Sequence, residues 1–221
     1  MLAASLESMQ HQVEHAQARV QWSAVLPIVV IVLIVFAVRH IGVIAHEGAH
    51  AIAGRSMGRK VSWVELNGDA TGATLTLGPE KGLRRVITSF AGYLGPSLFG
   101  LGGAILIALG YNRAVLGLTL LFLIILLFRV RNLFGVISVL ANGALIILVV
   151  RYGSAKLQDG AAYCLSWLLL LSGVVHVISH GSNAGDAATL RDITHIPRFV
   201  WFMLWLVITV AALVAGARML T

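Results

Sequence analysis

The chain has 221 residues, of which 58% are hydrophobic and only 11% are charged. This composition is typical of multi-pass membrane proteins and excludes a soluble domain with a single packed core. The formal net charge of +7 does not indicate nucleic-acid binding, because the Lys and Arg residues lie in short segments between apolar runs and do not cluster with aromatic residues. Cys164 is the only cysteine, which excludes an intrachain disulfide and a cysteine-based metal cluster.

Residues 1–23 are polar and of mixed charge. They have no basic region ahead of a small-residue cleavage site, so we expect no cleavable signal peptide and expect the first apolar segment to direct insertion. A single membrane-embedded domain then accounts for residues 1–221, with no appended regulatory domain such as a PDZ domain.

Six segments are candidates for membrane-spanning helices, each of which needs about 20 apolar residues. They lie approximately at 24–53, 84–109, 113–129, 132–150, 161–180 and 198–217. The third is short and close to its neighbours, so the count is five or six. The predicted fold is therefore an all-α multi-pass membrane protein with about six transmembrane helices.

One segment between the first two helices differs from the rest. Apolar residues and threonines alternate over residues 73–77, and the turn-rich tripeptide Asn67-Gly68-Asp69 precedes them. This pattern predicts a small β-hairpin over residues 61–78. Such a strand could hold an extended substrate by backbone pairing, or the hairpin could be an amphipathic cap on the membrane surface.

The distribution of basic residues predicts the orientation. With six helices and the N-terminus outside, the inner segments hold most of the Lys and Arg residues. The first and fifth helices then both end at the inner face. We expect this to be the cytoplasmic face of the plasma membrane.

The pentapeptide His46-Glu47-Gly48-Ala49-His50 lies late in the first apolar segment. Positions i and i+4 of a helix share a face, so both imidazoles could bind one ion while Glu47 lies one residue further round as a candidate general base. Histidines on an apolar helix can also be hydrogen-bonded core residues. A carboxylate within a membrane is costly, however, and function is its default explanation, so this H-E-x-x-H sequence predicts a metal site.

A hydrolytic zinc ion usually has three protein ligands, so the two histidines need a partner. Asp186 is our candidate, because it follows the fifth helix and has small neighbours that allow close approach. Its alternative role is as the N-cap of a short helix that starts near Ala187. Asp192 is expected to be a surface residue paired with a nearby arginine.

Further polar residues lie near Asp186. His176 and His180 form a second i, i+4 pair, which could supplement the site, hydrogen-bond a ligand or hold a second metal; we favour a supporting role around the ligands. Asn183 could donate a hydrogen bond to the substrate carbonyl or to the developing oxyanion. Arg39 shares the helix face of His46, which suggests a polar lining or a path for water.

Three motifs carry a family resemblance. They are His46-Glu47-Gly48-Ala49-His50, Ala91-Gly92-Tyr93-Leu94-Gly95-Pro96, and Gly185-Asp186-Ala187 followed by Thr194-His195-Ile196-Pro197. Together they resemble the intramembrane zinc metalloproteases of the site-2 protease family, and most closely its compact branch without a PDZ domain. The glycines and the proline of the second motif are expected to serve close helix packing or a helix break.

The resemblance implies one zinc ion per chain, bound by His46, His50 and Asp186, with Glu47 as the catalytic base. It also implies a membrane-anchored protein substrate that is cut within or near the lipid bilayer. The sequence departs from the better-known members, which carry Asn-x-x-Pro ahead of an Asp-Gly pair. Here Asn183 precedes Asp186 without an intervening proline, and alanine follows the aspartate.

Two other functions have to be weighed. A divalent-metal transporter can also place His and Glu residues in a membrane helix, but it needs polar ligands at several depths, and the third, fourth and sixth apolar segments hold almost no ionisable residues between their ends. A non-catalytic pseudoprotease would bind membrane proteins without cutting them, and the intact Glu47 argues against it. No residue pattern selects a particular substrate or an oligomeric state.

Overall fold

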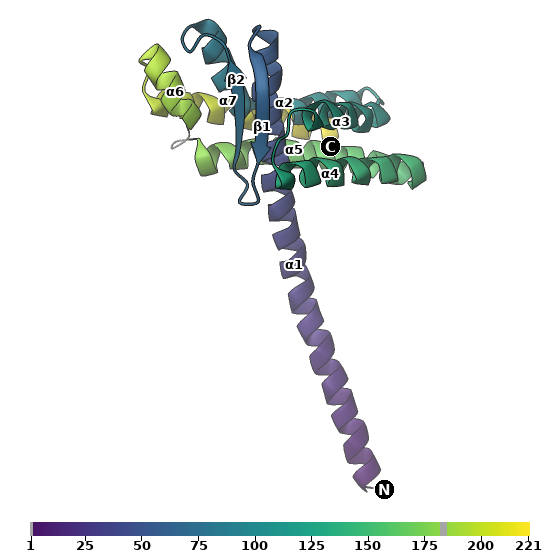
Figure 1. Cartoon of the computed structure of the whole chain (residues 1–221). Coiled ribbons are helices and arrows are strands. Elements are labelled where there is room, and N and C mark those ends of the chain that lie inside the picture. The colour runs from purple at the N-terminus through teal and green to yellow at the C-terminus, as the bar shows by residue number, and fades with distance from the viewer. Residues whose placement is uncertain (1, 182–184) are drawn as a thin grey trace. The chain divides into compact units, whose positions relative to one another are not determined.

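The computed structural model describes residues 2–181 and 185–221, and Figure 1 labels their helices and strands. Within these ranges the order is α1 (Leu2–Ser56), β1 (Lys60–Leu66), β2 (Gly72–Leu77), α2 (Leu83–Ala108), α3 (Asn112–Leu127), α4 (Leu133–Tyr152), α5 (Ala155–His180), α6 (Gly185–Thr194) and α7 (Arg198–Leu220). The chain divides into two compact units, residues 1–37 and residues 38–221. The second unit contains every candidate site residue that the structure describes.

Five helices of the described residues are long and apolar enough to cross a membrane. They comprise Val29–Ser56 of α1 together with α2, α4, α5 and α7. Helix α3 is apolar but has only 16 residues, which at 1.5 Å per residue gives about 24 Å, less than the roughly 30 Å of a hydrocarbon core. The protein is therefore a multi-pass membrane protein, and the predicted count of five or six helices is confirmed.

Two helices begin earlier than the hydropathy pattern predicts. Helix α1 begins at Leu2 and so includes the polar segment before the apolar run. Helix α5 begins at Ala155, ahead of the apolar segment predicted from residue 161, because the Ser154 hydroxyl accepts a hydrogen bond from the Leu157 amide at 3.3 Å and caps the helix. The first turn of α5 is polar, so a hydropathy pattern does not detect where this helix begins.

Helix α2 packs against α3, α5, α6 and α7. Small residues permit the closest of these approaches: a Cβ on Gly100 of α2 would lie 2.7 Å from the Leu170 amide nitrogen of α5, and one on Gly173 of α5 would collide with Ser97 of α2. Membrane helices associate through such small residues because lipid supplies no hydrophobic driving force between them.

The predicted β-hairpin is confirmed. Strands β1 and β2 pair antiparallel, with Val64 opposite Thr74 and Leu66 opposite Gly72. Asp69 organises the turn, since its carboxylate accepts hydrogen bonds from the Thr71 amide at 3.0 Å and from the Thr71 hydroxyl at 2.6 Å. These bonds hold the pKa of Asp69 below its ordinary value.

The connection between α3 and α4 holds the other edge of β1. The Val64 amide donates to the Arg129 carbonyl at 2.8 Å, and the Arg131 amide donates to the Val64 carbonyl at 3.0 Å. The Asn132 side chain adds two hydrogen bonds to the Leu66 backbone, at 3.1 and 2.6 Å. Strand β1 is thus paired on both edges, whereas the second edge of β2 has no strand partner among the described residues.

Candidate metal centre

Helix α1 brings His46 and His50 together as their spacing predicts. Their Nε2 atoms lie 3.0 Å apart, and the two residues are only 5% and 8% exposed. The 3.6-residue period alone accounts for this placement, because residues four apart lie one above the other on a helix. The pair therefore offers two nitrogen ligands in a buried setting.

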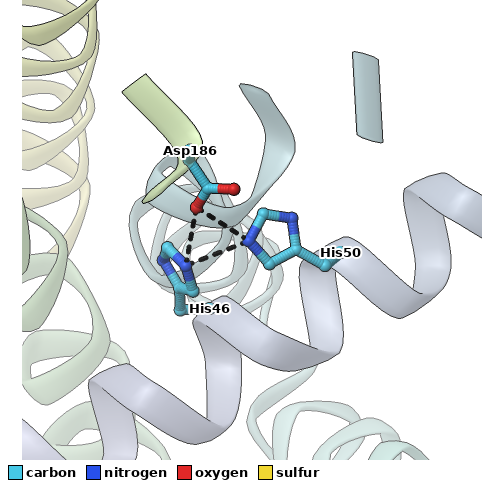
Figure 2. Close-up of side chains that lie close together, drawn as sticks. All are labelled: His46, His50 and Asp186. Carbon is cyan, nitrogen blue, oxygen red and sulfur yellow. Dashed lines mark hydrogen bonds and ion pairs between the residues drawn. The ribbon is translucent and has the colours of Figure 1, made fainter. Parts of the chain in front are cut away.

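Asp186 completes a triangle of donor atoms. Its Oδ2 lies 3.4 Å from His46 Nε2 and 3.1 Å from His50 Nε2. Figure 2 marks these contacts with dashed lines. Asp186 is the second residue of α6, and the buried side chains of Ala187 and Leu190 fix that helix against its neighbours. Its carboxylate points toward the histidines, so the structure brings together the three residues that were expected to be ligands.

The triangle fits a metal ion. Ligand atoms about 2.0–2.1 Å from a tetrahedral zinc ion lie about 3.3 Å from one another, and the three observed separations are 3.0, 3.1 and 3.4 Å. Two imidazole nitrogens and one carboxylate oxygen are also a donor set that zinc accepts. Among the described residues, this is the one group of three or more His, Cys, Asp or Glu side chains with such geometry.

Contacts behind the candidate ligands favour the binding of a cation. His50 Nδ1 lies 2.7 Å from the Thr88 carbonyl oxygen. A carbonyl only accepts, so Nδ1 carries the proton and, in a neutral imidazole, leaves a lone pair on the Nε2 that faces the triangle. Burial disfavours the charge of Asp186, but His50 and His46 outweigh it and hold the pKa of this carboxyl well below its ordinary value.

Helix α2 packs closely against α1 at two glycines. A Cβ on Gly92 would collide with His50 Nε2 and lie 2.8 Å from His46 Cε1. One on Gly95 would lie 2.7 Å from the Ala45 carbonyl oxygen. Both glycines serve close packing, as expected, but Gly92 packs against the candidate ligands themselves.

Glu47 is 4% exposed and points toward strand β2. The Thr74 hydroxyl lies 2.6 Å from Glu47 Oε2. A Cβ on Gly72 would lie 2.8 Å from Glu47 Oε1. The sequence predicted the hairpin but not its contacts with Glu47. The two-residue period of a strand does place residues 72 and 74 on one face, and this was the one sequence signal for these contacts.

The second histidine pair lies beside the triangle and is not part of it. The His176 ring centroid lies 4.6 Å from that of His46, and His180 lies one ring further on at 5.1 Å from His176. Tyr93 packs edge-on against His46 at 4.6 Å. His176 and His180 therefore lie next to a candidate ligand. Among the described residues, the group whose donor atoms converge contains His46, His50 and Asp186 and not this second pair.

The remaining candidates are placed as follows. Arg39, His176 and His180 line a cavity of about 10 Å³, roughly the space of one water molecule. Asp192 is paired with Arg191 at 2.6 Å, as expected. Asn183 lies outside the described residues, so its predicted role as an oxyanion donor stays a prediction.

The apolar helices and the candidate metal centre together define the class as a multi-pass membrane protein with a His, His and Asp cluster beside a buried glutamate. Residues 20–216 match the family described as Peptidase M50B-like. The chain therefore belongs to this family, which is the site-2 protease family of membrane metallopeptidases. No curated protein and no solved structure matches the chain.

Proposed function

We propose that this protein is an intramembrane zinc metalloendopeptidase that hydrolyses peptide bonds of membrane-anchored proteins within or near the bilayer. Family membership supports the peptidase activity. The observation that carries the finer proposal is the triangle of His46 Nε2, His50 Nε2 and Asp186 Oδ2 beside the buried Glu47. A metal and a general base are the two parts that this hydrolysis needs.

One zinc ion per chain would be held by His46, His50 and Asp186. Bound there, zinc would lower the pKa of a water molecule toward about 7 and polarise the scissile carbonyl. The Nδ1 hydrogen bond of His50 to the Thr88 carbonyl fixes the tautomer that such binding requires. His176 and His180 would support the site by packing against His46.

Glu47 is the proposed catalytic base. It would take a proton from the attacking water and return that proton to the leaving amine, since one carboxyl group can serve both steps in turn. Its side chain is buried, and its helix position next to His46 would bring it close to the reacting atoms.

The substrate would bind in an extended form, because a helix hides the peptide bond that has to be cut. Strand β2 supports this proposal, since its second edge has no strand partner among the described residues and its backbone passes Glu47 at Gly72. A substrate strand could pair with such an edge. The basic residues near the end of α1 and the start of α2, such as Arg55, Arg84 and Arg85, support a site that opens toward the cytoplasmic side of the plasma membrane.

The proposal is tested by measuring zinc and cleavage together. Purified wild type should contain about one zinc per chain and should cleave a transmembrane peptide, whereas His46→Ala and Asp186→Ala should lose both. Glu47→Gln is the matched control, because it should keep the zinc and lose cleavage.

Each rival predicts a different result. If Asp186→Ala retained zinc, Asp186 would not be the third ligand, and His176 and His180 would be the next candidates. Zinc bound by the wild type without cleavage would favour a pseudoprotease. Zinc flux into wild-type proteoliposomes would favour a transporter, although the charged residues of α3, α4 and α7 lie at or next to their ends.

A further inference from the structure

Strand β2 is fixed against the part of α1 that carries Glu47. Because side chains two residues apart share a face of a strand, Gly72, Thr74 and Thr76 all face α1. Thr76 packs beside Gly54 of α1, where a Cβ on that glycine would lie 2.9 Å from its methyl group. Arg59, which is 2% exposed, donates to the Thr76 hydroxyl at 3.2 Å and to the Thr76 carbonyl at 3.0 Å.

Thr74 lies in the middle of this fixed strand and has two acceptors within reach. Its hydroxyl oxygen is 2.6 Å from Glu47 Oε2 and 3.0 Å from the Glu47 backbone carbonyl oxygen. A hydroxyl has one hydrogen to donate. The shorter distance is that of a hydrogen bond to a carboxylate, which is also the stronger acceptor, so the hydrogen goes to the side chain.

Gly72 confines the other oxygen of the same carboxylate. A Cβ at this position would lie 2.7 Å from Glu47 Cγ and 2.8 Å from Oε1, closer than real side chains approach. The absent side chain therefore leaves the space that the Glu47 carboxylate fills. One oxygen is hydrogen-bonded to Thr74 and the other lies beside Gly72, and both contacts come from β2.

We propose that Thr74 is a positioning residue for Glu47 and that the hairpin is thereby part of the catalytic apparatus. This inference rests on the proposed function, in which Glu47 is the general base. Its physical reason is that proton transfer needs the base within hydrogen-bond reach of the attacking water, and small misplacements lower the rate steeply. The Thr74 hydroxyl fixes the rotamer of a side chain that α1 alone leaves free to turn.

The kinetic test compares three single variants with the wild type. Thr74→Val, which keeps the shape and removes the hydroxyl, should lower kcat by about tenfold or more, with KM and zinc content unchanged. Thr74→Ser restores the hydroxyl and should return kcat to within about threefold of the wild type. Thr119→Val of α3 is the matched control, because it removes a threonine hydroxyl that bonds the Val115 carbonyl of its own helix, and its kcat per bound zinc should stay within about threefold of the wild type.

The second test needs neither zinc nor activity. In the presence of a chelator, Thr74→Val should lower Tm by about 2–4 °C when Glu47 is present. In a Glu47→Ala background the same substitution should lower Tm by less than half as much, because the partner is already gone. Equal shifts in the two backgrounds would mean that Thr74 serves only the helix carbonyl, and would overturn the proposal.

The two failures can be told apart. If the wild type cleaves and Thr74→Val has wild-type kcat, the positioning role is wrong while the proposed function stands. If the wild type cleaves no transmembrane peptide, the proposed function fails and the catalytic role of Thr74 fails with it. A loss of kcat in Thr74→Val that Thr74→Ser does not repair would also overturn the role of the hydroxyl.

Discussion

The chain holds two histidine pairs with the same four-residue spacing in apolar helices, and they differ in what surrounds them. His46 and His50 of α1 meet the carboxylate of Asp186 at 3.4 and 3.1 Å. His176 and His180 of α5 stack as tilted rings 5.1 Å apart, and they do not belong to the described group of converging donor atoms. Equal spacing therefore does not make equal sites.

Three features distinguish the first pair. A carboxylate from another helix reaches both Nε2 atoms, the Thr88 carbonyl sets the tautomer of His50, and Gly92 leaves the room that the two rings need. The second pair packs against the first through His176 and His46. The neighbours of the histidines thus distinguish the candidate metal centre from the second pair as much as the histidines themselves do.

The largest expected effect separates the two pairs directly. His50→Ala should abolish cleavage and lower zinc affinity more than about a hundredfold, because it removes one of the three proposed ligands. His180→Ala should keep zinc near one per chain. Zinc content by elemental analysis decides this prediction, and equal losses in the two variants would contradict the assignment of ligands.

Removal of the metal should destabilise only a protein that binds it. With free zinc at 100 times its dissociation constant, binding adds about 2.7 kcal/mol, which corresponds to a Tm about 5–10 °C higher than in chelator. The wild type and His180→Ala should show this shift, and His50→Ala should not. Thermal unfolding in detergent with and without chelator measures it; a shift that persists in His50→Ala would place the zinc elsewhere.

Filling the space beside His46 and His50 should have a smaller effect on zinc affinity, and a second glycine of α2 provides the control. Gly92→Ala puts a methyl group where His50 Nε2 and His46 Cε1 lie, so zinc affinity should fall by about 10–100-fold. Gly102→Ala on the same helix meets nothing within 4 Å and should bind zinc like the wild type. Competition with a chelating dye measures both affinities, and equal values for the two variants would show that α2 tolerates the methyl group.

The smallest expected effect concerns the packing of the second pair. His176→Phe keeps an aromatic ring against His46 and removes the ring nitrogens, so zinc affinity should stay within about threefold of the wild type. The same dye competition measures it. A loss of tenfold or more would show that a His176 nitrogen takes part in binding.

The parts of the site that depend on local sequence were predictable. The period of a helix is local, so the H-E-x-x-H spacing placed His46 and His50 on one face before any tertiary structure was known. The alternation of apolar residues and threonines predicted the hairpin in the same way. Asp186 could be proposed only from its place after the fifth helix and from the family resemblance.

The contacts that complete the site were not predictable from the sequence. Thr74 meets Glu47 across 27 positions of the chain, and the Thr88 carbonyl meets His50 across 38 positions. A strand pattern shows which residues share a face but not which helix residue that face meets. The backbone carbonyl of Thr88 carries no side-chain signal, because every residue has the same group.

The separation of the ligands along the chain has a consequence for biosynthesis. Asp186 lies 136 positions after His50. During synthesis α1 and its histidines enter the membrane long before α6 exists, so the nascent chain carries two of the proposed ligands and the proposed base without the third proposed ligand. Under the proposed function, the metal centre would be complete only when α6 has been made and has docked, so the chain would not cut newly inserted proteins nearby before then.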